Sequence, residues 1–120
     1  MADKKKILIV DDEAIICESL GEFLERRGYE VTLAKNGEQA LASIKAAFFP
    51  VVVLDLKIPD IDGEVVLKEI IKLYPDSKVI IVTGFTEGTS REELVAKGAH
   101  DCMFKPIGIK DMFEKIEKLY

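Results

Sequence analysis

The stretch Val51-Val52-Val53-Leu54-Asp55 decides the fold, because a wholly apolar run ends there in a single carboxylate. The same pattern occurs upstream, where the apolar run 7–10 leads into Asp11-Asp12-Glu13. Two further apolar runs end in a hydroxyl and in a cation; they are 79–82, followed by Thr83, and 102–104, followed by Lys105. Apolar runs without polar alternation are typical of parallel strands that are covered on both faces. The polar residues at their ends therefore indicate one site at the edge of a parallel sheet.

The rest of the chain alternates between strand-like and helical patterns. The predicted strands are 7–10, 30–34, 51–54, 79–82 and 101–104. Helical stretches follow each of them, and the second has an apolar stripe that reaches Phe48 before Pro50. Strict alternation predicts a doubly wound α/β domain with a five-stranded parallel sheet, strand order 2-1-3-4-5 and five helices. In that order the winding reverses between strands 1 and 3, and the crevice outside their carboxyl ends is the expected binding site.

Length and composition limit the classes of protein to consider. The 120 residues are enough for one domain, 1–120, with a single core. A net charge of −5 argues against nucleic-acid binding, which needs a clustered excess of Lys and Arg. No apolar stretch is long enough to span a membrane, so we expect a cytoplasmic protein. Cys17 and Cys102 lie far apart in apolar surroundings, which favours two buried thiols over a disulfide.

The acidic residues at the strand ends indicate a metal site. Asp11 to Glu13 also stand where a helix begins, so helix capping is an alternative for one Asp, and compensation of the helix dipole in the first turn is an alternative for the Glu. Capping does not explain two adjacent aspartates beside Asp55, because carboxylates about 6 Å apart repel by roughly 3 kcal/mol at an effective dielectric constant near 20. Lys105 can offset part of this repulsion, and a divalent ion can offset more. Oxygen ligands without His or Cys favour Mg²⁺.

The same residues fit phosphoryl transfer. An ionised carboxylate attacks phosphorus without a general base, and Asp55 is the best candidate for the nucleophile because it is central. A metal ion and a lysine stabilise charge on the transferring oxygens. Thr83 can donate a hydrogen bond to those oxygens. Taken singly, Thr83 is also an ordinary strand residue and Lys105 an ordinary exposed charge.

In four motifs the sequence resembles the receiver domain of bacterial two-component response regulators. The motifs are Val10-Asp11-Asp12-Glu13, the segment 55–63 (DLKIPDIDG), Val82-Thr83-Gly84 and Lys105-Pro106. They occur in order and the resemblance covers the whole chain. It implies a flavodoxin-like fold and a signalling domain that is not an enzyme, although it catalyses its own phosphorylation and dephosphorylation.

The resemblance also assigns roles to residues. It implies that Asp55 accepts phosphate from a histidine kinase or phosphotransfer protein, while Thr83 and Lys105 bind the phosphoryl group. It implies that Asp12, Asp55 and the backbone carbonyl of Lys57 ligate Mg²⁺ and that Asp11 acts largely through water. It further implies a cis Lys105–Pro106 bond, a third helix that starts at Gly63, and space for the phosphoryl group beside Gly84.

Some positions depart from the family pattern. Cys102 stands where family members often carry a Tyr or Phe that couples to the threonine. Asp60 stands where Gly is frequent and Ile58 where Met is frequent. Phe85 occupies a position at which side chains often control water access, so we hypothesise that Phe85 shields the acyl phosphate.

Three other readings stay open. A haloacid-dehalogenase-like phosphatase also uses a strand-end Asp with Mg²⁺, but its second Asp is replaced here by Lys57. A flavodoxin-like FMN binder needs a loop rich in Ser, Thr and Gly after strand 1 to bind phosphate, where this chain has the acidic Asp11-Asp12-Glu13. A degenerate receiver would act only as an interaction module. The resemblance implies that the signal passes to a separate effector protein or to a fused output domain, through a surface formed by the fourth helix, the fifth strand and the fifth helix.

Overall fold

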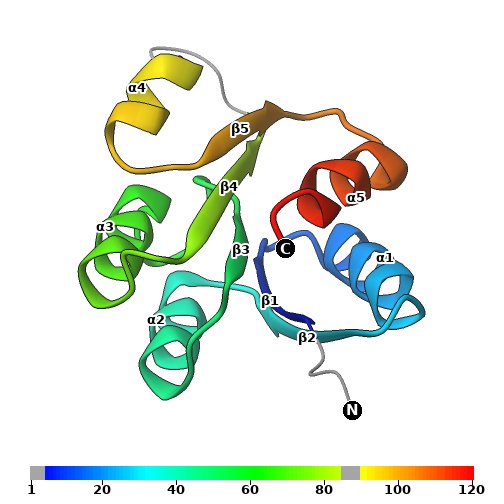
Figure 1. Ribbon diagram of the computed structural model, residues 1–120. Helices are drawn as coiled ribbons and strands as arrows, with labels where there is room; N and C mark the ends of the chain where they lie inside the picture. The colour runs from blue at the N-terminus through cyan, green and yellow to red at the C-terminus, as the bar shows by residue number, and fades with distance from the viewer. Residues whose placement is uncertain (1–4, 85–89) are drawn as a thin grey trace.

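A five-stranded parallel sheet with helices on both faces forms the domain (Figure 1). The computed structural model describes residues 5–84 and 90–120. Its elements are β1 (Lys5–Val10), α1 (Ala14–Glu25), β2 (Tyr29–Ala34), α2 (Gly37–Ala46), β3 (Val51–Leu54), α3 (Gly63–Leu73), β4 (Lys78–Thr83), α4 (Arg91–Ala96), β5 (Asp101–Phe104) and α5 (Ile109–Glu117). Among the described residues, no helix has both the length and the apolar character needed to cross a membrane.

The strand order is β2-β1-β3-β4-β5, with all neighbours parallel. This confirms the order predicted from the alternating pattern, with β2 and β5 at the edges. The register is also decisive for the site, because Val10 pairs with Leu54 and Leu54 pairs with Ile81. The carboxyl ends of the central strands therefore stop at nearly the same level.

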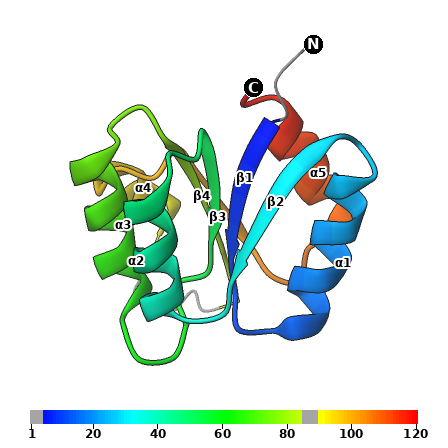
Figure 2. The same cartoon turned by 90° about the horizontal axis from the view of Figure 1, so that it is seen from below.

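Two apolar layers hold the helices to the sheet. Figure 2 shows α1 and α5 on one face, and α2, α3 and α4 on the other. Alternate β1 residues divide between these layers: Ile7 and Ile9 pack with the α1 and α5 side, Leu8 and Val10 with the opposite side. All four residues of β3 are buried, as expected for a central strand covered on both faces.

The predicted second helix was too long. We expected its apolar stripe to reach Phe48, but α2 ends at Ala46 and the next residue is extended. Phe48 is 42 % exposed and its ring lies 5.4 Å from the ring of Tyr74. The physical reason is tertiary packing, because Phe48 contacts Tyr74 outside the helix instead of extending the apolar face of α2.

A comparison of two glycines tests how closely α4 packs on α3. Gly98 has a φ of +113°, and a Cβ added there would overlap Cδ1 of Ile71. Gly28 has a φ of +88° with no atom within 4 Å of such a Cβ. We expect Gly28→Ala to lower the free energy of unfolding by about 1 kcal/mol through backbone strain alone. Gly98→Ala should lower the free energy of unfolding by about 1–3 kcal/mol more than Gly28→Ala does, because Ile71 must also move. Urea unfolding measures both, and equal losses in the two variants would contradict this packing.

Candidate functional site

Backbone hydrogen bonds fix the predicted site residues at the strand ends. The N–H groups just past β1, β3 and β5 each donate to the last residue of a neighbouring strand. The bonds are Asp11 N to Ala34 O (3.0 Å), Asp55 N to Val10 O (2.9 Å) and Lys105 N to Thr83 O (2.8 Å). Because the ladder continues through these residues, their side chains emerge at one edge of the sheet.

Three carboxylates meet at this edge. Asp11, Asp12 and Asp55 each offer an oxygen, and these atoms lie within 4.8 Å of one another. Asp11 and Asp55 are 5 % and 4 % exposed, whereas Asp12 is exposed to solvent. Hard oxygen donors with one solvent-facing member suit Mg²⁺, which binds through a few carboxylates and keeps several waters. The residues present therefore fit the predicted metal ion.

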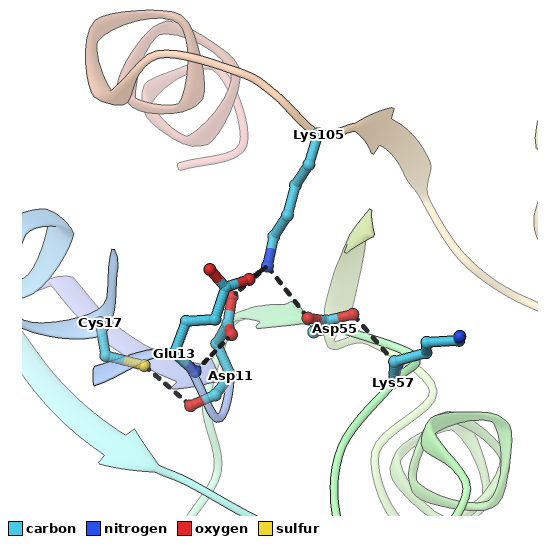
Figure 3. A network of polar contacts seen from close by, with 6 residues as sticks. All are labelled: Asp11, Glu13, Cys17, Asp55, Lys57 and Lys105. Atoms are coloured by element: carbon cyan, nitrogen blue, oxygen red, sulfur yellow. Dashed lines mark hydrogen bonds and ion pairs between the residues drawn. The ribbon is translucent and has the colours of Figure 1, made fainter. Parts of the chain in front are cut away.

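Lys105 is the cation of the site (Figure 3). Its ammonium Nζ lies 2.8 Å from Oδ2 of Asp11 and 3.0 Å from Oδ2 of Asp55. A third partner is Oε1 of Glu13, at 2.7 Å. Burial by itself would lower the pKa of Lys105, but the hydrogen bonds to the three carboxylates outweigh it and raise that pKa. Lys105 thus stays charged and offsets part of the carboxylate repulsion, as the sequence predicted.

In each of the two buried carboxylates, the oxygen that does not contact Lys105 accepts a hydrogen bond from a backbone N–H group two residues further along the chain. Oδ1 of Asp55 accepts from the N–H of Lys57 at 3.0 Å. Oδ1 of Asp11 accepts from the N–H of Glu13 at 2.9 Å. Glu13 is the N-cap of α1 and its side chain makes no capping hydrogen bond. The carboxylate of Glu13 binds Lys105 instead, and its expected interaction with the helix dipole stays a prediction.

The backbone around Asp55 has little freedom. Gly63 begins α3, as predicted, and donates its N–H to the carbonyl of Leu56 at 3.1 Å. A Cβ at Gly63 would lie 2.5 Å from Cα of Leu56 and 2.8 Å from the carbonyl oxygen of Asp55. Only glycine lets α3 pack directly on this turn. The Lys105–Pro106 bond is cis, which confirms that expectation as well.

A pocket opens above Asp55. It is lined by Asp12, Glu13, Asp55, Lys57, Gly84 and Lys105. Thr83 is the last residue of β4 and directly precedes Gly84, and its side chain is fully buried. Its predicted contact with a phosphoryl group stays a prediction. Phe85, the proposed shield, lies outside the described residues.

Two contacts were missed by sequence reasoning. Glu13 was assigned only to the first turn of a helix, although its position beside two acids was a signal for the cluster. Cys17 donates its Sγ–H to the carbonyl of Asp11 at 3.0 Å, directly beneath the site. Burial and then the charge of Asp11 raise the pKa of Cys17 to about 11. Cys17 and Cys102 are both buried and free, as predicted.

Replacement of Lys105 tests its role as the resident cation. We expect Lys105→Met to lower the free energy of unfolding by about 1–3 kcal/mol, because buried carboxylates lose their partner. Added MgCl₂ should stabilise this variant more than the native chain, since the ion replaces the missing charge. The pKa of Lys105 is higher in the folded chain than in the unfolded chain, where it is roughly 10.4. The Lys105 ion pairs therefore contribute fully to the free energy of unfolding below that pH, and this contribution is lost as the pH rises through the folded-state pKa.

Urea unfolding at pH 7 with and without MgCl₂ measures the effect of the ion, and urea unfolding without MgCl₂ from pH 7 to 11 measures the pH dependence. Lys115→Met is the matched control, because Lys115 pairs with Asp101 at the other end of β5. It removes the same charge and should leave the MgCl₂ response unchanged. An identical MgCl₂ response in native and Lys105→Met chains would contradict the assignment.

Comparisons with known proteins agree on one family. Residues 7–117 match the family model for the response regulator receiver domain. The transcriptional regulatory protein ZraR of Salmonella typhimurium is 36 % identical over 115 residues, which cover 96 % of this chain and 26 % of that protein. The chain thus spans about a quarter of the length of this curated relative.

Solved structures give the same result. A CheY-like receiver domain protein from Methanospirillum hungatei has a TM-score of 0.87 and 40 % identity, and the match covers 98 % of this chain and 94 % of that one. The response regulator TrrA of Thermotoga maritima, in complex with Mg²⁺-BeF, has a TM-score of 0.84 and 37 % identity, with 97 % and 99 % covered. The chain belongs to the receiver domain family of two-component response regulators.

Proposed function

We propose that this receiver domain accepts a phosphoryl group on Asp55, in the presence of Mg²⁺, from a histidine kinase or phosphotransfer protein. One observation carries the proposal. Asp55 lines the pocket while it is 4 % exposed, and it has Lys105 Nζ at 3.0 Å and two other carboxylates within 4.8 Å. This arrangement supports the assignment of Asp55 as the nucleophile, Lys105 as the cation and the carboxylates as metal ligands.

The reaction needs no base. A carboxylate oxygen of Asp55 attacks phosphorus as the bond from phosphorus to the donor imidazole nitrogen breaks, and that nitrogen keeps the electron pair. Lys105 already contacts Asp55, so its ammonium is in place to bind an oxygen of the transferred group. We assign the hydroxyl of Thr83 to a further oxygen, as the family resemblance implies.

The proposed metal ligands are those that the family resemblance implies. We assign Mg²⁺ binding to the carboxylates of Asp12 and Asp55 and the backbone carbonyl of Lys57, with Asp11 acting through water. The bound ion supplies positive charge to the phosphoryl oxygens. The acidic cluster is compatible with this ion, and the similar protein TrrA was solved with Mg²⁺-BeF.

The signal must leave through a second surface. Receiver domains are signalling domains rather than enzymes that act on separate substrates, and we propose self-catalysed phosphorylation and dephosphorylation as the only chemistry. We assign output to α4, β5 and α5, towards a separate effector or a fused domain. Asp101 at the start of β5 ties these elements together: it binds Arg91 of α4 at 2.8 Å and Lys115 of α5 at 2.6 Å. The cytoplasmic location stays a prediction.

Phosphorylation by a small acyl-phosphate donor tests the proposal. With MgCl₂ we expect one labile phosphoryl adduct in the intact mass spectrum, absent in Asp55→Asn and in excess chelator. Asp62→Asn is a matched control, because Asp62 accepts the N–H of Glu64 in α3 and lies outside the carboxylate cluster. It should keep the adduct. No adduct on the native chain would support the degenerate receiver, and steady turnover of a phosphoester would support the phosphatase.

A further inference from the structure

Asp60 connects the turn after β3 to a helix that lies elsewhere in the sequence. It has a φ of +72°, the one positive value for a non-glycine residue among residues 5–84 and 90–120. Its Oδ1 accepts from the N–H of Gly37 at 2.9 Å, and its Oδ2 from the N–H of Glu38 at 3.2 Å. These two donors belong to the first turn of α2. The carboxylate of Asp60 therefore caps a helix that begins 23 residues earlier.

The contact is close as well as polar. A Cβ added at Gly37 would lie 2.5 Å from Cβ of Ile61 and 3.1 Å from Oδ1 of Asp60. The N–H of Gly37 also lies 3.5 Å from the carbonyl oxygen of Pro59. Glycine at the start of α2 thus lets the turn pack directly against the helix.

The same turn carries part of the proposed metal site. Lys57 donates its N–H to Asp55, and its carbonyl is the proposed backbone ligand. The turn is closed at its base by the bond from Gly63 N–H to the carbonyl of Leu56. Asp60 fixes its far end to α2. A turn held at both ends keeps the peptide of Lys57 in one orientation.

We propose that Asp60 is a positioning residue for the Mg²⁺ site. It touches no proposed ligand; by binding the first turn of α2 it holds the 55–63 turn in the conformation that presents the backbone of Lys57 beside Asp55. This inference rests on the proposed function.

Three variants separate positioning from charge and from helix stability. Asp60→Gly retains the positive φ and removes all the side-chain acceptors. Asp60→Asn removes the charge but keeps one acceptor oxygen for the first turn of α2, and Asn tolerates this backbone conformation. Asn36→Ala removes the other cap of α2, the bond from Gln39 N–H to Oδ1 of Asn36, and leaves the 55–63 turn untouched.

Isothermal titration calorimetry of each full chain with MgCl₂, at low and at high salt, gives the dissociation constants. We expect Asp60→Gly to weaken binding about tenfold, the lower end for residues that orient a metal ligand. Asp60→Asn should show a smaller loss at both salt concentrations. Asn36→Ala should bind MgCl₂ like the native chain although urea unfolding shows a less stable protein.

If Asp60→Gly bound MgCl₂ as tightly as the native chain does, the inference would be overturned and the proposed function would remain intact. Equal losses in Asp60→Gly and Asp60→Asn that vanish at high salt would also overturn the inference, since these identify a charge effect. A loss in Asn36→Ala as large as in Asp60→Gly would show that general stability of α2 is responsible. Absence of MgCl₂ binding by the native chain would overturn the proposed metal site itself.

Discussion

Asp11 and Asp55 lie side by side because the N–H of Asp55 donates to the carbonyl of Val10, one residue before Asp11. The same register pairs Val10 with Leu54 and Leu54 with Ile81, so β1 and β3 end together at this edge. All four residues of β3 are buried, and Asp55 is the first polar residue after them. The apolar strand and the acidic residue after it act as one unit.

That placement has an electrostatic cost. Buried carboxylates with oxygens within 4.8 Å repel one another, and the net stability of a domain is only about 5–15 kcal/mol. Lys105 reduces the cost by bonding to both buried aspartates and to Glu13. The arrangement leaves Asp12 exposed and still close to the others, so a second cation can approach from solvent. Lys105 thus offsets part of the repulsion, and the cluster remains compatible with a dication.

The sequence predicted the parts of this site that depend on the period of apolar residues. Strand positions, strand order and the edge that carries Asp11, Asp55 and Lys105 all follow from which residues must be buried. It did not predict that Glu13 would bind Lys105, because this bond spans 92 positions and depends on the direction in which α1 leaves β1. Such directions are set by packing.

Asp60 is a second residue whose contacts could not be predicted from local sequence patterns. Asp tolerates positive φ, so the sequence permitted a left-handed residue where Gly is frequent. The capping of α2 by its carboxylate depends on how closely two loops approach, which local patterns do not encode. The length of α2 was overestimated for a related reason, because an apolar residue at helical spacing, Phe48, packs against Tyr74 outside any helix.

Cys17 gives this domain a built-in chemical reporter. Its thiol is fully buried under Asp11 and its pKa is about 11, so the reactive thiolate is scarce at neutral pH. Alkylating reagents can reach it only when α1 separates from the sheet, which makes the labelling rate a measure of local opening next to the acidic cluster. Mass spectrometry of the labelled native sequence could follow that opening without any introduced probe.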